Sequence, residues 1–150
     1  MKNLQIGDTA PEINSVDQNN DRITLEQYKG KKVVLYFYPK DMTPGCTAQS
    51  CNLRDNYQSL LDNGYIVLGC SVDSPSRHIK FIEKYELPFP LISDGDKKVV
   101  EDYGVWGLKK FMGKEYMGIN RTTFIINENG IIEDIIEKVK TKDHTNQILK

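Results

Sequence analysis

The sequence has few of the residues that mark a specialised class of protein. Its 150 residues include two histidines, one tryptophan and three cysteines, and no Cys-x-x-Cys pair. No apolar run reaches the roughly 20 residues of a membrane-spanning helix, and the first residues contain no hydrophobic secretion signal. Three cysteines are also too few for the disulfide framework of a small secreted protein. We therefore expect a cytoplasmic protein in a reducing compartment, with no membrane partner.

An excess of charge of one sign is also missing. The net charge is −1, from 20 basic and 21 acidic residues. Without a concentrated positive field the chain has little to attract nucleic acid, so we expect no nucleic-acid partner. His78 and His144 are far apart in the sequence and have no partner at metal-ligand spacing. The pattern therefore does not indicate a metal site, and we expect both histidines at exposed helix positions.

The length and the order of the predicted elements indicate one domain, residues 1–150. Continuous β-branched and aromatic runs at 33–38 and 65–72 predict strands that are buried on both faces. A helix is predicted after each strand, the first from Pro44 to the stop signal Asn63-Gly64 and the second over 76–85. This alternation predicts an α/β, thioredoxin-like fold with a central mixed β-sheet flanked by helices.

Shorter patterns fill in the rest of the chain. They predict a hairpin tip at 17–21, a brief helix at 24–28, a strand at 91–92, a small helix near 98–103, a hairpin of strands 122–126 and 131–136 around Asn129-Gly130, and a last helix over 143–150. The stretch 104–118 is rich in glycine and aromatic residues but has no clear period. We interpret it as a structured loop.

The chemistry is expected where the first strand meets the first helix. Thr43 suits the N-cap and Pro44 the first helical position. Cys46 then falls in the first turn, where unpaired N–H groups and the helix dipole favour a thiolate. A lone cysteine is more often an inert part of the core. The sequence by itself leaves both interpretations open.

A second cysteine follows on the same predicted helix. Cys46 and Cys51 are five residues apart, which on an intact helix means about 7.5 Å of rise and Cα atoms about 8 to 9 Å apart. A disulfide requires Cα atoms within about 7 Å. If these two cysteines bond, the first turn or two of the helix must unwind, and oxidation becomes a conformational change.

Five motifs are spread over nearly the whole chain. They are Pro39-x-x-x-Thr43-x-x-Cys46, Thr43-Pro44-Gly45-Cys46-Thr47-x-x-x-Cys51, Gly69-x-Ser71-x-Asp73-Ser74, Tyr103-Gly104-Val105-Trp106-Gly107 and Gly118-Ile119-x-Arg121-x-x-Phe124-Ile125-Ile126. Together they resemble the motifs of peroxiredoxins, thiol enzymes that reduce hydroperoxides, and in particular the branch called bacterioferritin comigratory protein or peroxiredoxin Q.

The resemblance implies roles for individual residues. Cys46 is expected to attack hydrogen peroxide or an organic hydroperoxide and to become a sulfenic acid. Arg121 is expected to favour the thiolate and to polarise the O–O bond, and the Thr43 hydroxyl to bind the peroxide oxygens. Pro39, which has no N–H, is expected to shield the site from water. Gln49 stands where the family often has a carboxylate, and its role stays open.

The resemblance also implies a reaction cycle. Cys51 is expected to resolve the sulfenic acid as an intramolecular disulfide, which thioredoxin or a similar dithiol reduces. The alternative for Cys51 is a packed helix cysteine beside a one-cysteine peroxidase. Cys70 lies mid-strand and is expected to pack. No metal, haem or flavin is required, and the branch suggests a monomer.

A different class of function stays possible on the sequence. The two cysteines could form a redox switch that alters partner binding, with peroxide reduction too slow to matter. Trp106, Phe111 and Tyr116 could line the access to the site or a docking surface, or they could simply pack.

Overall fold

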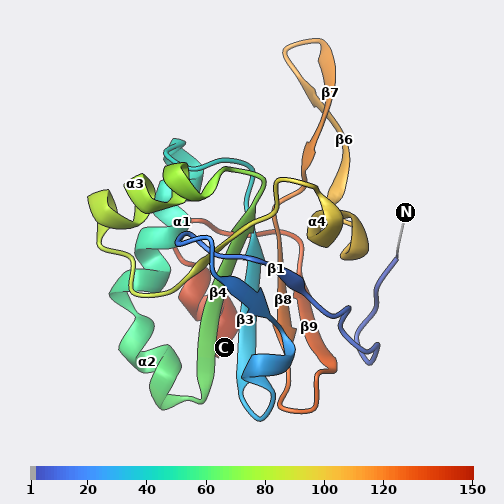
Figure 1. The fold of residues 1–150 in the computed structure, drawn as a ribbon. Helices are drawn as coiled ribbons and strands as arrows, with labels where there is room; N and C mark the ends of the chain where they lie inside the picture. Colours follow the sequence, from blue (N-terminus) through green and yellow to red (C-terminus); the bar gives the residue numbers. More distant parts are fainter. Residues whose placement is uncertain (1–2) are drawn as a thin grey trace.

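The computed structural model describes residues 3–150 and has a mixed, seven-stranded sheet at its centre (Figure 1). The strand order is β2-β1-β5-β4-β3-β8-β9, in which β3, β4 and β5 are parallel and the other pairs are antiparallel. The strands are β1 (Asn14–Val16), β2 (Arg22–Thr24), β3 (Lys32–Phe37), β4 (Tyr65–Ser71), β5 (Leu91–Ser93), β8 (Thr122–Ile126) and β9 (Ile132–Ile136). The predicted fold class is confirmed.

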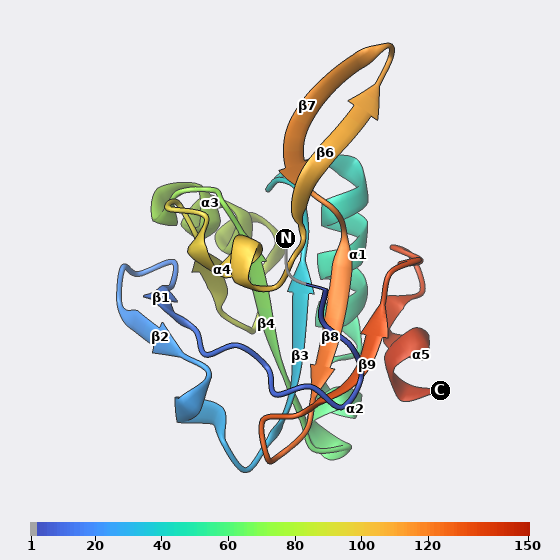
Figure 2. The same ribbon diagram turned by 90° about the vertical axis from the view of Figure 1, so that its right-hand side faces the viewer.

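Helices cover both faces of this sheet, and Figure 2 shows α1 and α5 on the same side of the strands. Their bounds are η1 (Glu26–Tyr28, a 3₁₀ turn), α1 (Pro44–Asp55), α2 (Tyr57–Asp62), α3 (Pro75–Tyr85), α4 (Lys98–Asp102) and α5 (His144–Leu149). Apart from α1 and α2, each matches a predicted helix to within about two residues, the usual scatter at helix ends. In residues 3–150, no helix is both long enough and apolar enough to cross a membrane.

Strand β3 is buried on both faces because its side chains alternate between two cores. Val33, Leu35 and Phe37 join one core. Val34 and Tyr36 join the other, together with residues of α1, α2, α3 and α5. Each fully buried side chain of this size contributes about 1.5 to 3 kcal/mol of hydrophobic free energy. The end of β3, where the site begins, is therefore held rigidly from both sides.

The helix predicted to run from Pro44 to the Asn63-Gly64 stop is two helices. It breaks at Asn56, whose backbone angles (φ −112°, ψ 13°) are not helical. The Asn56 side-chain amide donates to the carbonyl of Asn52 at 2.8 Å. Asparagine competes in this way for backbone partners and so disfavours helix interiors. The apolar stripe continues across the break, so periodicity alone could not reveal it.

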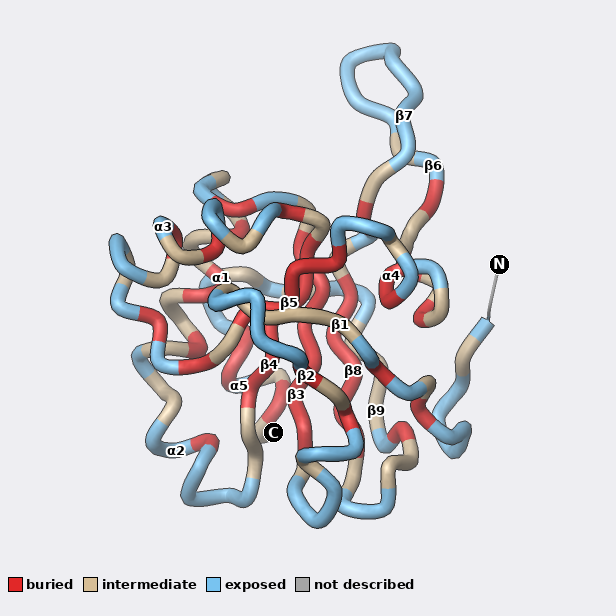
Figure 3. Tube along the Cα trace, in the orientation of Figure 1, coloured by how far each residue is buried: buried red, intermediate tan, exposed pale blue. Residues whose placement is uncertain are grey.

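The stretch predicted as a loop is a β-hairpin made of β6 (Trp106–Phe111) and β7 (Lys114–Ile119). It projects away from the sheet, and most of it is exposed (Figures 1 and 3). A ribbon with solvent on both faces needs no apolar alternation, which is the signal that identifies strands. The loop prediction was wrong for that reason.

The prediction of exposed histidines was also wrong, because both side chains are fully buried. His78 lies on the same face of α3 as Phe81, which packs in the core. His144 Nε2 lies 2.8 Å from the Thr123 hydroxyl, and its Nδ1 lies 2.8 Å from Gln147 Oε1. Burial lowers the pKa of His144, although the Gln147 contact opposes this. Complete hydrogen bonding allows both rings to be buried.

Candidate active site

The loop that follows β3 leads into the amino terminus of α1. Thr43 is the N-cap residue with extended angles (φ −81°, ψ 151°), and Pro44 is the first helical residue, as predicted. The Thr43 hydroxyl does not cap the helix but donates to the carbonyl of Lys40 at 2.7 Å. Cys46 lies in the first turn and is fully buried. The thiol therefore sits beside the positive end of a twelve-residue helix.

Sheet register brings Arg121 to this thiol from 75 residues away. Strands β3 and β8 are antiparallel and pair Phe37 with Thr122, so Arg121 lies beside the residue that follows Phe37. Its Nη2 is 3.3 Å from Cys46 Sγ. A Cβ on Gly45 would lie 3.2 Å from the same nitrogen, so a glycine leaves room for the guanidinium. The resting site thus pairs a sulfur with a permanent cation.

Gln49 fixes the orientation of this arginine. Arg121 Nη1 donates to Gln49 Oε1 at 2.7 Å. The amide nitrogen of Gln49 is therefore turned away from the arginine, and it finds no hydrogen-bond partner among the described residues although it is buried. Leaving such a donor unsatisfied costs about 1 to 3 kcal/mol. The carboxamide thus serves as an acceptor for Arg121, and its donor is not used within the described residues.

The other two cysteines differ in their surroundings. Cys51 is half-buried on α1 and, like Cys46 and Cys70, is a free thiol. Burial raises the pKa of the Cys51 thiol, the Arg54 charge opposes this and Asp55 adds to it. Cys70 is fully buried in β4 and belongs to a core cluster, in agreement with the expected packing. Burial, with the nearby Asp94 carboxyl, raises the pKa of Cys70 well above its usual value.

A buried polar network beneath the loop was missed by the sequence analysis. The Asp41 carboxylate accepts from the Tyr38 hydroxyl at 2.5 Å and lies 2.6 Å from His78 Nδ1, while His78 Nε2 lies 3.0 Å from the carbonyl of Ile92. Asp73 Oδ2 accepts the backbone N–H of Asp41 at 2.8 Å. Asp41, Asp73 and His78 are close enough together to suggest a metal site, but their facing atoms are engaged with one another or with other groups. The network ties the loop to α3, β4 and β5.

Two signals could have found this network. Asp41 stands inside the Pro39-to-Cys46 motif. His78 lies three residues before Phe81, a helical spacing that places both side chains on the buried face of α3. Pro39, also within the motif, is half-buried at the start of the loop.

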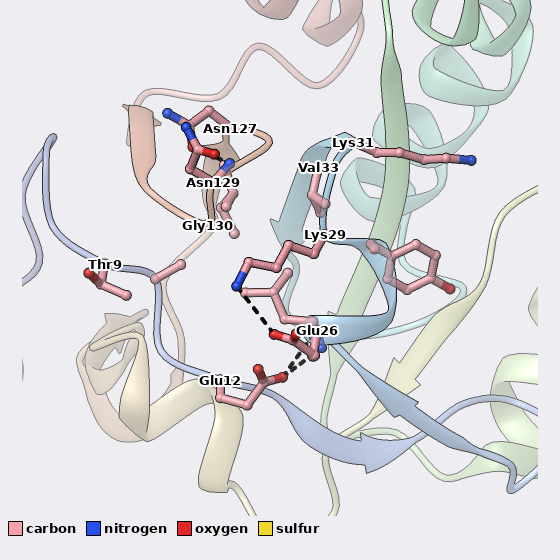
Figure 4. A pocket seen from close by; sticks show the side chains of 13 residues that line it. Thr9, Glu12, Glu26, Lys29, Lys31, Val33, Asn127, Asn129 and Gly130 are labelled. Atoms are coloured by element: carbon pink, nitrogen blue, oxygen red, sulfur yellow. Dashed lines mark hydrogen bonds and ion pairs between the residues drawn. The ribbon is translucent and has the colours of Figure 1, made fainter.

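A separate pocket of about 110 Å³ lies at the opposite end of β3 (Figure 4). Its lining includes Lys31, which precedes the strand, and Val33, near the start of the strand, whereas Cys46 follows the other end of the strand. Glu12 borders the pocket, and its Oε1 accepts from the backbone N–H groups of Ile13, Leu25 and Glu26. This carboxylate fastens the amino-terminal segment to η1. The pocket is not connected with the thiol.

The arrangement of Cys46, Arg121 and a helix terminus can be compared with known proteins. A model of the family described as AhpC/TSA matches residues 6–135. The chain belongs to the AhpC/TSA family. The putative peroxiredoxin bcp of Haemophilus influenzae is 48% identical over 149 residues, which are 99% of this chain and 96% of the relative. The peroxiredoxin Bcp of Bacillus subtilis is 46% identical over 98% of this chain and 94% of its own.

A solved structure of the Xanthomonas campestris bacterioferritin comigratory protein, described by its alkyl peroxide reduction activity, aligns with a TM-score of 0.85 at 33% identity. The alignment covers 91% of this chain and 87% of that one. The predicted resemblance to peroxiredoxins of this branch is confirmed. The enzyme class follows, because peroxiredoxins are thiol-dependent peroxidases.

Proposed function

We propose that Cys46 is the peroxidatic thiol of this peroxiredoxin, acting on hydrogen peroxide and organic hydroperoxides. Its thiolate attacks the terminal oxygen, an S–O bond forms and the O–O bond breaks. The leaving oxygen takes the bonding electron pair and a proton from water, which releases water or an alcohol. The peroxide is reduced and the sulfur is oxidised to a sulfenic acid.

The single observation that carries this proposal is the 3.3 Å contact between Arg121 Nη2 and Cys46 Sγ at the start of α1. A fixed cation and a helix amino terminus both favour the anionic form of sulfur. The same cation can stabilise charge on the leaving oxygen. The Thr43 hydroxyl already donates its hydrogen to the carbonyl of Lys40. Its role is therefore to accept a hydrogen bond from the peroxide. Pro39 limits access of water.

Cys51 completes the cycle in this proposal. Its thiol attacks the sulfenic sulfur, the S–S bond forms and water leaves. Thioredoxin or a similar dithiol then reduces the disulfide and is itself oxidised. Because both cysteines lie on the continuous helix α1, the bond requires local unwinding. Unwinding also exposes Cys51, which removes the burial that raises its pKa.

The remaining parts of the proposal concern the state of the protein. We propose that residues 1–150 act as one domain, as a monomer in the cytoplasm, without a metal, haem or flavin. These statements stand on the sequence pattern and the family resemblance, and light scattering of reduced protein tests the oligomeric state.

A coupled assay tests the function directly. Thioredoxin, its reductase and NADPH are mixed with hydrogen peroxide or an organic hydroperoxide, with and without the protein. NADPH oxidation is expected to depend on both the protein and the peroxide. Repeating the assay with dithiothreitol distinguishes a wrong dithiol partner from a wrong reaction, because a protein inactive with both reductants would refute the cycle.

Replacing Gln49 by methionine is expected to separate activity from stability. The variant keeps the side-chain volume but removes the acceptor that holds Arg121, so peroxide reduction should fall about tenfold. The free energy of unfolding should not fall, because the unsatisfied amide donor disappears as well. Stopped-flow kinetics and urea unfolding provide the two measurements.

Gln49→Glu is the matched control, since a carboxylate also accepts from the guanidinium. It should stay within about threefold of the parent rate. A methionine variant as fast as the parent would show that Gln49 does not position Arg121.

A further inference from the structure

Near the tip of the β6–β7 hairpin, several apolar residues are exposed and one lysine is half-buried. Every residue from 108 to 117 is exposed except Lys109, which is half-buried. Leu108, Phe111 and Met112 are among the exposed residues, with 58%, 65% and 86% of their surface in solvent. Placing an ammonium inward and apolar groups outward opposes the hydrophobic effect. Core packing therefore does not explain the position of Lys109.

Specific contacts hold this lysine. Its Nζ donates to the carbonyl of Ile119 at 2.9 Å, at the base of the hairpin. The stem of Lys109 crosses Gly118, where a Cβ would lie 3.2 Å from Lys109 Cδ. An ammonium has three N–H donors, and the Ile119 carbonyl is the only hydrogen-bond partner of Nζ among the described residues.

The held ammonium lies near the thiol site. Ile119 is two residues before Arg121, whose guanidinium contacts Cys46. Burial and the Arg121 charge lower the pKa of Lys109, and the Cys46 sulfur opposes them. The Lys109 ammonium is therefore held on segment 119–121, the same short segment that brings Arg121 to the thiol. Arg121 uses two of its five donors on Cys46 and Gln49, and Lys109 adds two uncommitted donors of its own.

We propose that Lys109 is a second cation of the peroxide site, supplied by the hairpin, which favours the Cys46 thiolate and stabilises the negative charge that the leaving oxygen acquires. This inference rests on the proposed role of Cys46. Arg121 contacts the sulfur, and Lys109 adds a second positive charge with free donors as the O–O bond breaks. The oxyanion that leaves is then protonated by water, so the lysine need not lose its proton.

The test compares Lys109→Met with Lys109→Arg and with Lys110→Met. Lys110 is the next residue of the same strand, but its side chain is exposed and pairs with Glu115 at 3.5 Å. Peroxide consumption by reduced protein is measured in a stopped-flow instrument. We expect Lys109→Met to be about three- to tenfold slower, with Lys109→Arg and Lys110→Met close to the parent.

A second readout separates charge from structure. Cys46 is alkylated with the neutral reagent iodoacetamide across a pH series, in a background where Cys51 and Cys70 are replaced by alanine. Loss of a nearby cation should move the half-maximal pH upward in Lys109→Met and leave it in place in Lys110→Met. If the substitution only distorts the hairpin, the maximal alkylation rate at high pH would change, but the pH of half-maximal alkylation would not.

The outcomes are distinguishable. Equal peroxide rates and equal midpoints for Lys109→Met and the parent would overturn the inference, as would equal losses in Lys109→Met and Lys110→Met. If Lys109→Met unfolds, Lys109→Gln replaces it in the same comparison. A parent protein that reduces no peroxide would refute the proposed function, whereas the alkylation midpoint would still report whether Lys109 acts on Cys46.

Discussion

Reduced protein in which Cys46 is replaced by serine is expected to consume hydroperoxide no faster than the uncatalysed reaction. Serine has the same shape, but its hydroxyl is not ionised near neutral pH and its oxygen cannot accept a second oxygen atom. The loss should therefore be the whole enzymatic acceleration, about 10⁶-fold or more. Rapid mixing with a stoichiometric amount of peroxide measures it without any reductant.

Cys70→Ala provides the control for this experiment. It also removes a thiol, but one that is fully buried in the core cluster beside the sheet. It should cost some stability through the lost packing and leave the peroxide rate close to that of the parent. If peroxide consumption survives Cys46→Ser and disappears in Cys70→Ala, Cys70 is the attacking thiol and the assignment of Cys46 is wrong.

The second large effect is expected from Cys51→Ser. One equivalent of peroxide should still be consumed at the parent rate, because Cys46 and Arg121 are untouched. Turnover with thioredoxin should then fall to a small residual rate, since no disulfide forms for the dithiol to reduce. Mass spectrometry with a sulfenic-acid trap should find the adduct on Cys46. Unimpaired cycling would mean that an outside thiol resolves the intermediate.

The same step predicts where the structure opens in the disulfide form. Amide exchange should accelerate from Thr43 to about Leu53, relative to reduced protein. Asn52 marks the far boundary, because its side chain accepts from Thr145 N at 2.8 Å and donates to the carbonyl of Lys142 at 3.1 Å. Equal protection in both redox states would contradict the unwinding.

The parts of the fold that the sequence predicts are those with a period or a turn signal. Strands β3 and β4 are continuous apolar runs, and the β8–β9 turn carries Asn129-Gly130. The position of Cys46 followed from Thr43 and Pro44 at the helix start. Each of these depends on residues close together in the chain, which is what local patterns can report.

The contact between Arg121 and Cys46 could not be derived from local pattern, because it depends on the register of β3 against β8. It was expected only through the family resemblance. The Asp41–His78 pair was not expected at all, because it depends on how the loop after β3 packs against α3, and its partners are 37 residues apart. The β6–β7 hairpin was missed because solvent surrounds both of its faces. Neither face has to be apolar, so its sequence shows no alternation of apolar and polar residues.

The break between α1 and α2 at Asn56 would limit how much of the molecule the proposed unwinding disturbs. Because α2 starts afresh at Tyr57 and keeps Leu60 buried, melting of the first helix need not propagate toward β4. In the proposed unwinding, the Asn52 side chain would stay hydrogen-bonded to Thr145 of α5, which limits how far the opening extends. In the proposed cycle, the protein would thus open and close at each turnover without exposing its apolar core to other molecules, and exposed apolar surface is what leads to aggregation.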